Sequence, residues 1–277
     1  MIKDILINLA IDNKGDRARD YAISLADKLD AHLTGIAFSY EPVLPMMGGG
    51  MEAIPAKYID EQRAENEKAA RLAKTSFQKS VGEAGLRSDC YSPNASAAGA
   101  AVLFARIGRH FDLAVVQQAE ATTPEYDYLI EATLFEGGRP VIVVPYIHKA
   151  APSFKHALVC WDGSKPAARA IADAIPLLRR AGKIEVITIA EAGKVTEEFP
   201  GAEIGQHLTR HGLKIEIKRI DVAETDVGNT ILSYASDVGA DFLVMGAYGH
   251  TRIREFVLGG VTNTILSSMT VPVLMSH

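Results

Sequence analysis

The chain contains one pattern of apolar and polar residues twice. Residues 5–10 (ILINLA) and 157–162 (ALVCWD) are short apolar runs typical of buried parallel strands, and they lie 152 positions apart. A helix-like segment follows each run, and its apolar positions, such as Ala18 and Ala170, keep the same offset. The repeat restricts the chain to a fold that can be built twice in tandem.

Two further matches complete the repeat. Residues 101–118 match 230–247 at an offset of 129, and 138–145 match 270–277 at an offset of 132. The fall in offset from 152 to 129 means that the first copy carries 23 extra residues, which we assign to an inserted loop at about 41–60.

We therefore expect an N-terminal domain over residues 1–147 and a C-terminal domain over 154–277, both of ordinary domain size. Apolar strand-like runs alternate with helical periodicity in each domain. This order predicts an α/β fold with two open, mostly parallel sheets covered by helices on both faces. Ligands of such sheets bind beyond the carboxyl ends of the strands.

Composition excludes several classes of partner. The net charge is −5, so no general positive field attracts nucleic acid or an anionic membrane. Cys90 and Cys160 are too few for a disulfide framework, which favours a reducing compartment. The N-terminal segment does not resemble a signal peptide, and no apolar run approaches the roughly 18 residues of a membrane span. We expect a cytoplasmic protein without membrane insertion.

The stretch from Asp241, DFLVMGAYGHTRIREFVLGGVTNTIL, carries the strongest functional signal. Gly246 and Gly249 follow a strand, and Gly259 and Gly260 precede a helix start. Glycines let backbone N–H groups approach an anion, and the start of a helix attracts negative charge. The pattern favours a phosphate site over a plain strand-to-helix turn.

The sequence here resembles the universal stress protein family, as a tandem of two such domains with a Rossmann-like fold of the adenine nucleotide alpha hydrolase type. Nucleotide-binding members of that family carry G-x2-G-x9-G followed by Ser or Thr, and Gly246, Gly249 and Gly259 have this spacing. Gly260 stands where the hydroxyl residue is expected, although Thr262 lies close by.

The resemblance implies a bound adenine nucleotide, ATP or AMP, with Mg²⁺ as an optional companion ion. The turn Asp162–Gly163–Ser164 matches the part of the family motif that contacts adenine, and it also suits a helix cap. The resemblance assigns adenine to Asp162 and Ile189, the ribose to Met245 and Gly246, and the phosphates to Gly249, Gly259, Gly260, Val261 and Thr262. His250, next to Gly249, is either a further contact of the phosphate or substrate or an exposed loop residue.

The first copy lacks these features. Ala10 stands at the position of Asp162, and Gln117, Gln118 and Glu120 replace the glycine turn. An acidic loop poor in glycine repels phosphate, so we predict one nucleotide site per chain, in the C-terminal domain.

Other signals are weaker. His207 and His211 lie four residues apart on a predicted helix, but two ligands do not make a metal site, and a solvated helix end is the default interpretation. No P-loop, dinucleotide or nucleophile-elbow motif occurs, and no residue presents itself as a catalytic base. We expect slow ATP hydrolysis at most.

The leading hypothesis is a stress-response regulator that senses an adenine nucleotide and acts through an unidentified protein partner. Similarity to the family also implies dimers through the final strand, hence a homodimer or a pseudo-dimer of the two halves of one chain. The alternatives are a nucleotide-independent stress scaffold and an enzyme acting on a small or lipid-like substrate.

Overall fold

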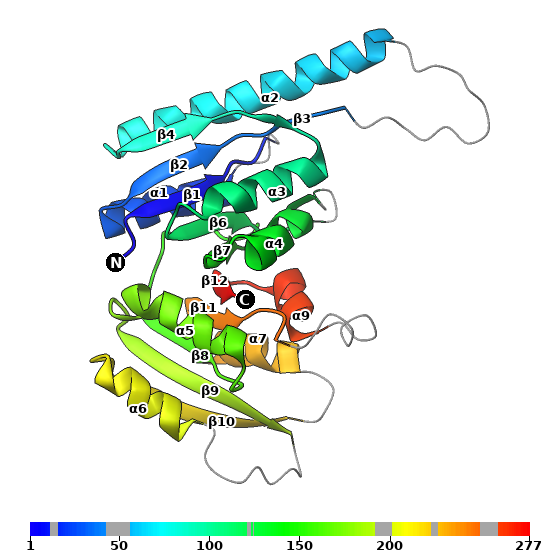
Figure 1. Cartoon of the computed structure of the whole chain (residues 1–277). Helices are drawn as coiled ribbons and strands as arrows, with labels where there is room; N and C mark the ends of the chain where they lie inside the picture. The colour runs from blue at the N-terminus through cyan, green and yellow to red at the C-terminus, as the bar shows by residue number, and fades with distance from the viewer. Residues whose placement is uncertain are drawn as a thin grey trace, which may run out of the picture.

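The computed structural model describes residues 1–11, 16–42, 56–120, 123, 125–191, 201–222, 227–249 and 260–277. Strands and helices alternate along these residues (Figure 1). The N-terminal half contains β1 (Asp4–Asn8), α1 (Arg17–Leu29), β2 (His32–Ile36), β3 (Ser39–Tyr40), α2 (Ala56–Glu83), β4 (Ser88–Tyr91), β5 (Asn94–Ala95), α3 (Ala97–Gly108), β6 (Leu113–Gln117), α4 (Glu125–Glu136) and β7 (Val141–Val144). The C-terminal half contains β8 (His156–Cys160), α5 (Lys165–Leu178), β9 (Lys183–Glu191), α6 (Ala202–Arg210), β10 (Glu216–Val222), α7 (Val227–Asp237), β11 (Phe242–Gly246), α9 (Val261–Ser268) and β12 (Val273–Ser276).

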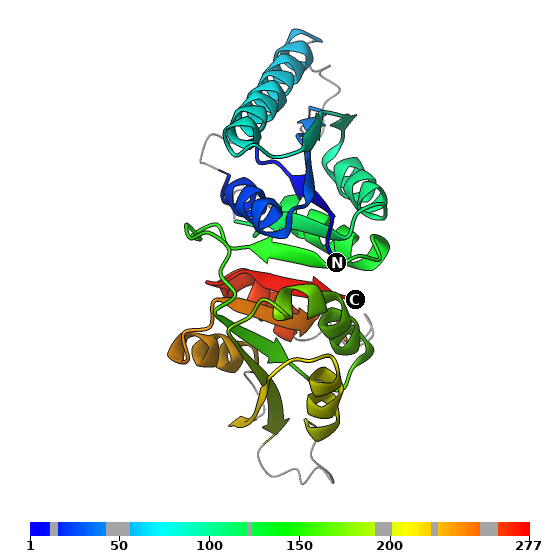
Figure 2. The ribbon, with the colours of Figure 1, turned by 90° about the vertical axis from the view of Figure 1, so that its left-hand side faces the viewer.

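Ten of the described strands form one continuous sheet in the order β10-β9-β8-β11-β12-β7-β6-β1-β2-β4. All pairs within each half are parallel. The two halves meet where β12 pairs antiparallel with β7, with Val273 opposite Val143 (Figure 2). We call this β7–β12 pair the seam. The expected tandem α/β fold, joined as a pseudo-dimer within one chain, is confirmed.

Helices cover both faces of the sheet and form two cores. In β1, Ile5 and Ile7 enter the core beneath α1, α2, α5 and α6, whereas Leu6 enters the opposite core beneath α3, α4, α7 and α9. Successive strand residues point to opposite faces, so a strand covered on both faces is apolar throughout. The short apolar runs of the sequence therefore mark the middle of the sheet.

The two copies differ in their loops. β1 and β8 begin 152 residues apart, but the N-caps of α1 and α5, Asp16 and Ser164, are only 148 apart. The connection between strand and helix is therefore four residues longer in the N-terminal half. The inserted loop expected at about 41–60 ends earlier than predicted because α2 begins at Ala56, and residues 43–55 lie outside the described residues.

The described helices include none with the length and apolar character needed to cross a bilayer. The longest, α2, spans 28 residues and carries i,i+4 ion pairs such as Lys57–Glu61 and Lys79–Glu83.

Candidate functional site

The turn between β8 and α5 is held by its own side chains. Asp162 Oδ1 accepts the N–H of Ser164 at 2.9 Å, and Ser164 Oγ accepts the N–H of Ala167 at 3.2 Å, which caps α5. Gly163 has a φ of 77°, in the left-handed region that favours glycine. The capping role suggested by the sequence is present, and Asp162 Oδ2 takes no part in these two bonds.

β11 runs beside β8, and its last residue, Gly246, touches the start of α5. A Cβ atom at Gly246 would lie 2.4 Å from the backbone nitrogen of Ala167 and 2.6 Å from the carbonyl carbon of Pro166. Real Cβ atoms do not approach a backbone this closely, so any other residue displaces the first turn of α5. Gly246 is therefore needed for helix packing, whatever it does for a ligand.

The turn after β11 folds back onto the Asp162 turn. A Cβ atom at Gly249 would lie 3.4 Å from Ser164 Oγ and 3.8 Å from Asp162 Oδ2, so the exposed Gly249 lies directly against both side chains. These distances bring together the two segments that the sequence singled out, although they are more than eighty residues apart along the chain.

Tyr248 ties this turn to the next helix. Its N–H donates to Thr262 Oγ1 at 3.1 Å, and its φ of 54° is unusual for a residue with a side chain. Because Thr262 is buried, its hydroxyl has a fixed position, and the bond from Tyr248 holds the turn in place. Sequence reasoning missed Tyr248; its place in the GAYG stretch, between Gly246 and Gly249, was the available signal.

The N-terminus of α9 lies next to this turn. Gly260 is its N-cap residue and provides no side chain to cap the first N–H groups, and Val261 and Thr262 begin the helix. Uncapped N–H groups and the helix dipole attract an anion at such a point. The arrangement therefore offers backbone donors beside the Tyr248–Gly249 turn, which itself lies against the Asp162 carboxylate.

The other predicted residues are placed less directly. Met245 is 5% exposed and packs its side chain in the core, so its backbone is the group that it offers to a ligand. Ile189 lies in β9, where it pairs with Ile220 of β10, but its side chain lies outside the described part of the chain. His250 and Gly259 also lie outside it.

The corresponding place in the N-terminal half is built differently. Asp16 caps α1 by accepting the N–H of Arg19 at 2.7 Å, and its other oxygen accepts the N–H of Ala10 at 2.8 Å. Gln117, which corresponds to Gly246, is 4% exposed, and Gln118 donates to the carbonyl of Leu266 in α9 at 2.7 Å. The N–H of Glu120, which corresponds to Gly249, donates to Thr123 Oγ1 at 3.0 Å, so a side chain already occupies this backbone donor.

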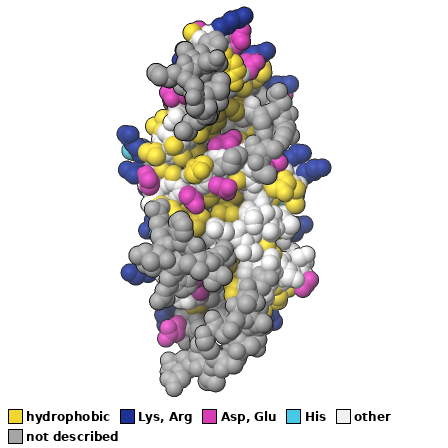
Figure 3. All heavy atoms as spheres, turned by 90° about the vertical axis from the view of Figure 1, so that its right-hand side faces the viewer, with side chains coloured by type: hydrophobic (Ala, Val, Ile, Leu, Met, Phe, Trp, Pro, Cys, Tyr) yellow, Lys and Arg dark blue, Asp and Glu magenta, His cyan; other side chains and the backbone are white. Residues whose placement is uncertain are grey.

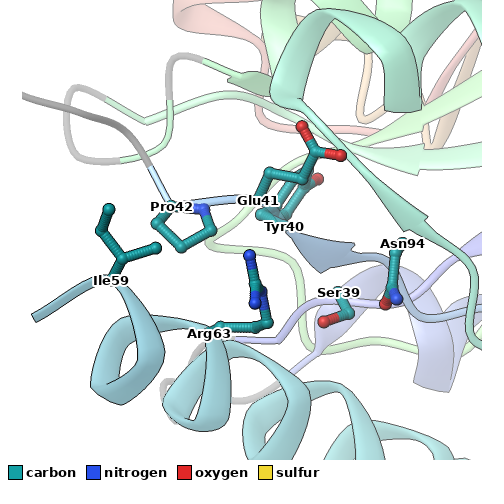
Figure 4. Close-up of a pocket in the computed structure, with 7 residues that line it drawn as sticks. All are labelled: Ser39, Tyr40, Glu41, Pro42, Ile59, Arg63 and Asn94. Carbon is teal, nitrogen blue, oxygen red and sulfur yellow. The ribbon is translucent and has the colours of Figure 1, made fainter. Parts of the chain in front are cut away.

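A hollow of about 280 Å³ does lie in the N-terminal half, between α2 and the β3–β5 pair (Figure 4). Arg63 reaches into it from α2, between Pro42 and Ser39, and Glu41 stands at its upper edge. One cation is thus balanced by one anion, and the lining residues that the structure describes include no glycine. The lining residues are Ser39, Tyr40, Glu41, Pro42, Ile59, Arg63 and Asn94.

Surface charge places a further condition on any polyphosphate ligand. Figure 3 shows acidic side chains near the middle of the visible face, between hydrophobic patches, in a protein of net charge −5. Binding of an anion then depends on local donors such as backbone N–H groups.

Two other signals have structural explanations. The rings of His207 and His211 contact each other edge to face at 4.7 Å near the end of α6, and the described residues contain no group of three potential metal ligands. Cys160 lies just before the Asp162 turn; burial, with the Asp162 charge adding to it, raises the pKa of its thiol well above the ordinary range. The thiol is therefore not an activated nucleophile.

Comparison with known proteins agrees with this architecture. Residues 153–277 match the model of the universal stress protein family. A universal stress protein of Synechocystis is 37% identical over 67 residues, which is 24% of this chain and 22% of the relative. One from Methanocaldococcus jannaschii is 29% identical over 103 residues, 32% of this chain and 62% of the relative. The chain thus spans less than two thirds of the length of either relative.

Similarity of fold extends over nearly the whole chain. The crystal structure of a universal stress protein from Archaeoglobus fulgidus superposes with a TM-score of 0.69, covering 98% of this chain and 94% of that one at 17% identity. At this identity the likeness establishes the fold alone. Residues 153–277, the C-terminal half, thus match the universal stress protein family, and the chain as a whole shares the fold of a universal stress protein.

Proposed function

We propose that the C-terminal half binds one adenine nucleotide, ATP or AMP, and that the protein is a stress-response regulator that signals this binding through its conformation or a protein partner. The observation that carries the proposal is the meeting of the Asp162 turn with the Gly249 turn, beside the uncapped N-terminus of α9. This arrangement combines a carboxylate acceptor with backbone donors, as a purine base and a phosphate chain require.

Each described residue of the site has a role in the proposal. Asp162 Oδ2, next to Gly249, accepts the exocyclic amine of adenine, while Oδ1 keeps the turn closed. The backbone of Gly249, Gly260 and Val261 donates to the phosphates. Gly260 lacks the hydroxyl that the family motif has at this position. The Thr262 hydroxyl partly compensates, because it accepts the N–H of Tyr248 and so holds the turn in place.

The chemistry of the site favours binding over turnover. Among the described residues of the two turns, Asp162 carries the only carboxylate, and this group already accepts the N–H of Ser164. Rapid phosphoryl transfer requires a positioned nucleophile and metal ligands in addition to phosphate donors. Mg²⁺ would be held chiefly by the phosphates and water, as is common for this ion. We therefore expect hydrolysis to be slow at most.

The proposal includes the organisation of the chain. Residues 1–147 and 154–277 form its two domains, and the protein acts in the cytoplasm. A homodimer must use a surface other than the edge of the final strand, because β12 already pairs with β7 inside the chain.

The first experiment identifies the nucleotide. Freshly purified protein is denatured, the released material is analysed by chromatography and mass spectrometry, and ATP and AMP are then titrated into stripped protein. Trp161, the single tryptophan, immediately precedes Asp162, so its fluorescence reports binding at this site. Near one adenine nucleotide per chain supports the proposal. Near two places a second site in the N-terminal half, and none, without binding on titration, favours a nucleotide-independent scaffold.

A substitution locates the site. Asp162→Ala removes the proposed adenine acceptor and should weaken ATP and AMP binding by about tenfold or more, since a hydrogen bond to a charged group is lost. Asp237→Ala is the matched control, because Asp237 is an exposed aspartate at the end of α7 in the same half. Equal affinities in the two variants would exclude Asp162 from the site.

A further inference from the structure

An aromatic cluster crosses the seam at the proposed nucleotide site. Phe135 comes from α4 of the N-terminal half, and its ring lies 4.9 Å from that of Tyr248 and 4.6 Å from that of His277. Figure 1 shows α4 and α9 facing each other across the seam. A side chain of one half therefore packs against the glycine turn of the other.

Tyr248 is the residue of the turn with the most constrained backbone. A side-chain-bearing residue seldom adopts a φ of 54°, so the surroundings must hold it there. Its N–H points to Thr262 Oγ1, which orients the turn toward α9. If its ring lost support, the neighbouring Gly249 and the start of α9 would lose their fixed relation.

Further contacts brace the same segment. His277 Nδ1 lies 3.0 Å from the carbonyl oxygen of Ala247, and the N–H of Ala247 donates to the carbonyl of Ser276 at 2.9 Å. Across the seam, the side chain of Gln118 bonds to the carbonyl of Leu266 in α9. The turn is thus held by the final residues of the chain and by the N-terminal half together.

We propose that Phe135 is a positioning residue for the nucleotide site: the N-terminal half sets the affinity of the C-terminal half by holding Tyr248, and with it the Gly249 turn, in its binding conformation. This inference rests on the proposed function. It gives the N-terminal half, whose own corresponding place is filled by Asp16 and Gln117, a direct part in nucleotide binding.

The test compares two aromatic truncations. Phe135→Ala removes the ring beneath Tyr248 and should weaken ATP binding about fivefold to tenfold, while Phe135→Tyr keeps the ring and should restore the affinity. Phe154→Ala is the control: Phe154 forms an edge-to-face pair with Phe242, at 5.2 Å, at the opposite ends of the strands that carry the site. It should lower stability and leave the affinity unchanged.

A second measurement needs no nucleotide. Hydrogen exchange of the Tyr248 amide, which donates to Thr262, should be faster in Phe135→Ala and unchanged in Phe154→Ala. Unchanged exchange and affinity in Phe135→Ala, or an equal loss of affinity in both alanine variants, would overturn the inference. If the wild-type protein binds no adenine nucleotide, the proposed function fails, and the exchange rates still decide whether Phe135 holds the turn.

Discussion

Asp16 should make the stability of the N-terminal half rise when the pH is lowered from 7 to 5. Asp16 is 7% exposed, and its carboxylate accepts the N–H groups of Arg19 and Ala10. Burial raises its pKa to about 6, because the cost of desolvating the charged form exceeds the stabilisation from these two bonds. The folded protein therefore binds the proton more tightly than the unfolded chain does.

The magnitude follows from the two pKa values. A shift from 3.8 to about 6 corresponds to about 3 kcal/mol in full. The contribution is fully present below the ordinary pKa and is lost as the pH rises through 6. Between pH 7 and pH 5 it amounts to about 1 kcal/mol. In Asp16→Asn this pH dependence of stability disappears. One of the two backbone N–H groups then faces the NH₂ group of the amide instead of an acceptor, which lowers the free energy of unfolding by about 1 kcal/mol at every pH.

The assay is denaturant unfolding of the wild type and Asp16→Asn between pH 7 and pH 5. The wild type should gain about 1 kcal/mol relative to the variant over this range, and Asp27→Asn, at an exposed position of α1, should follow the wild type. A wild-type stability that falls relative to Asp16→Asn on acidification would show that the two N–H groups outweigh desolvation.

Two other predictions concern the C-terminal half. Glu185 is 2% exposed and bonded to Lys183 and Tyr234; burial raises its pKa, but these partners outweigh it and hold the pKa below the ordinary range. The stabilisation from Glu185 is therefore present above about pH 4 and is lost as the pH falls through the lowered pKa of the folded protein. Glu185→Gln should reduce the free energy of unfolding by about 1 to 2 kcal/mol at pH 7 and by less below pH 4, as measured by denaturant unfolding. Gly246→Gln places the residue of the N-terminal half, Gln117, at the corresponding position; it should displace the start of α5, lower the melting temperature and remove nucleotide binding. Gly82→Gln is the control, because a Cβ atom there meets nothing within 4 Å, and it should have none of these effects. Normal binding by Gly246→Gln would mean that α5 yields without disturbing the site.

The repeat predicted the sheet well because its signal is local. Each buried parallel strand needs a short apolar run, and such runs survive in both copies. Helix starts were less predictable: the apolar pattern of a helix nearly repeats every four residues, so an offset of 152 aligns the apolar faces although the two helices begin 148 residues apart. Only the caps, Asp16 and Ser164, show that the first loop is longer by one helical turn.

In the candidate site too, residues with a local sequence signal were predictable and residues that depend on tertiary contacts were not. Gly246 and Gly249 were proposed from their spacing, because backbone donors near a phosphate require small residues at fixed positions, and Asp162 was proposed from the family resemblance. Tyr248 and Phe135 were not, since their contact depends on how two halves of the sheet join. The sequence also could not show that Gly246 serves helix packing, because a close approach to α5 and a close approach to a ligand select the same residue.

The difference between the halves has one structural origin. In the C-terminal half, a short turn brings α5 against the end of β11, which only glycine at 246 allows, and the backbone there stays accessible. In the N-terminal half, four extra residues let α1 begin later, so that Gln117 fits at the strand end and Asp16 takes the N–H of Ala10. Under the proposed function, the C-terminal half binds the nucleotide, and the N-terminal half contributes to that site across the seam, through the contact of Phe135 with Tyr248.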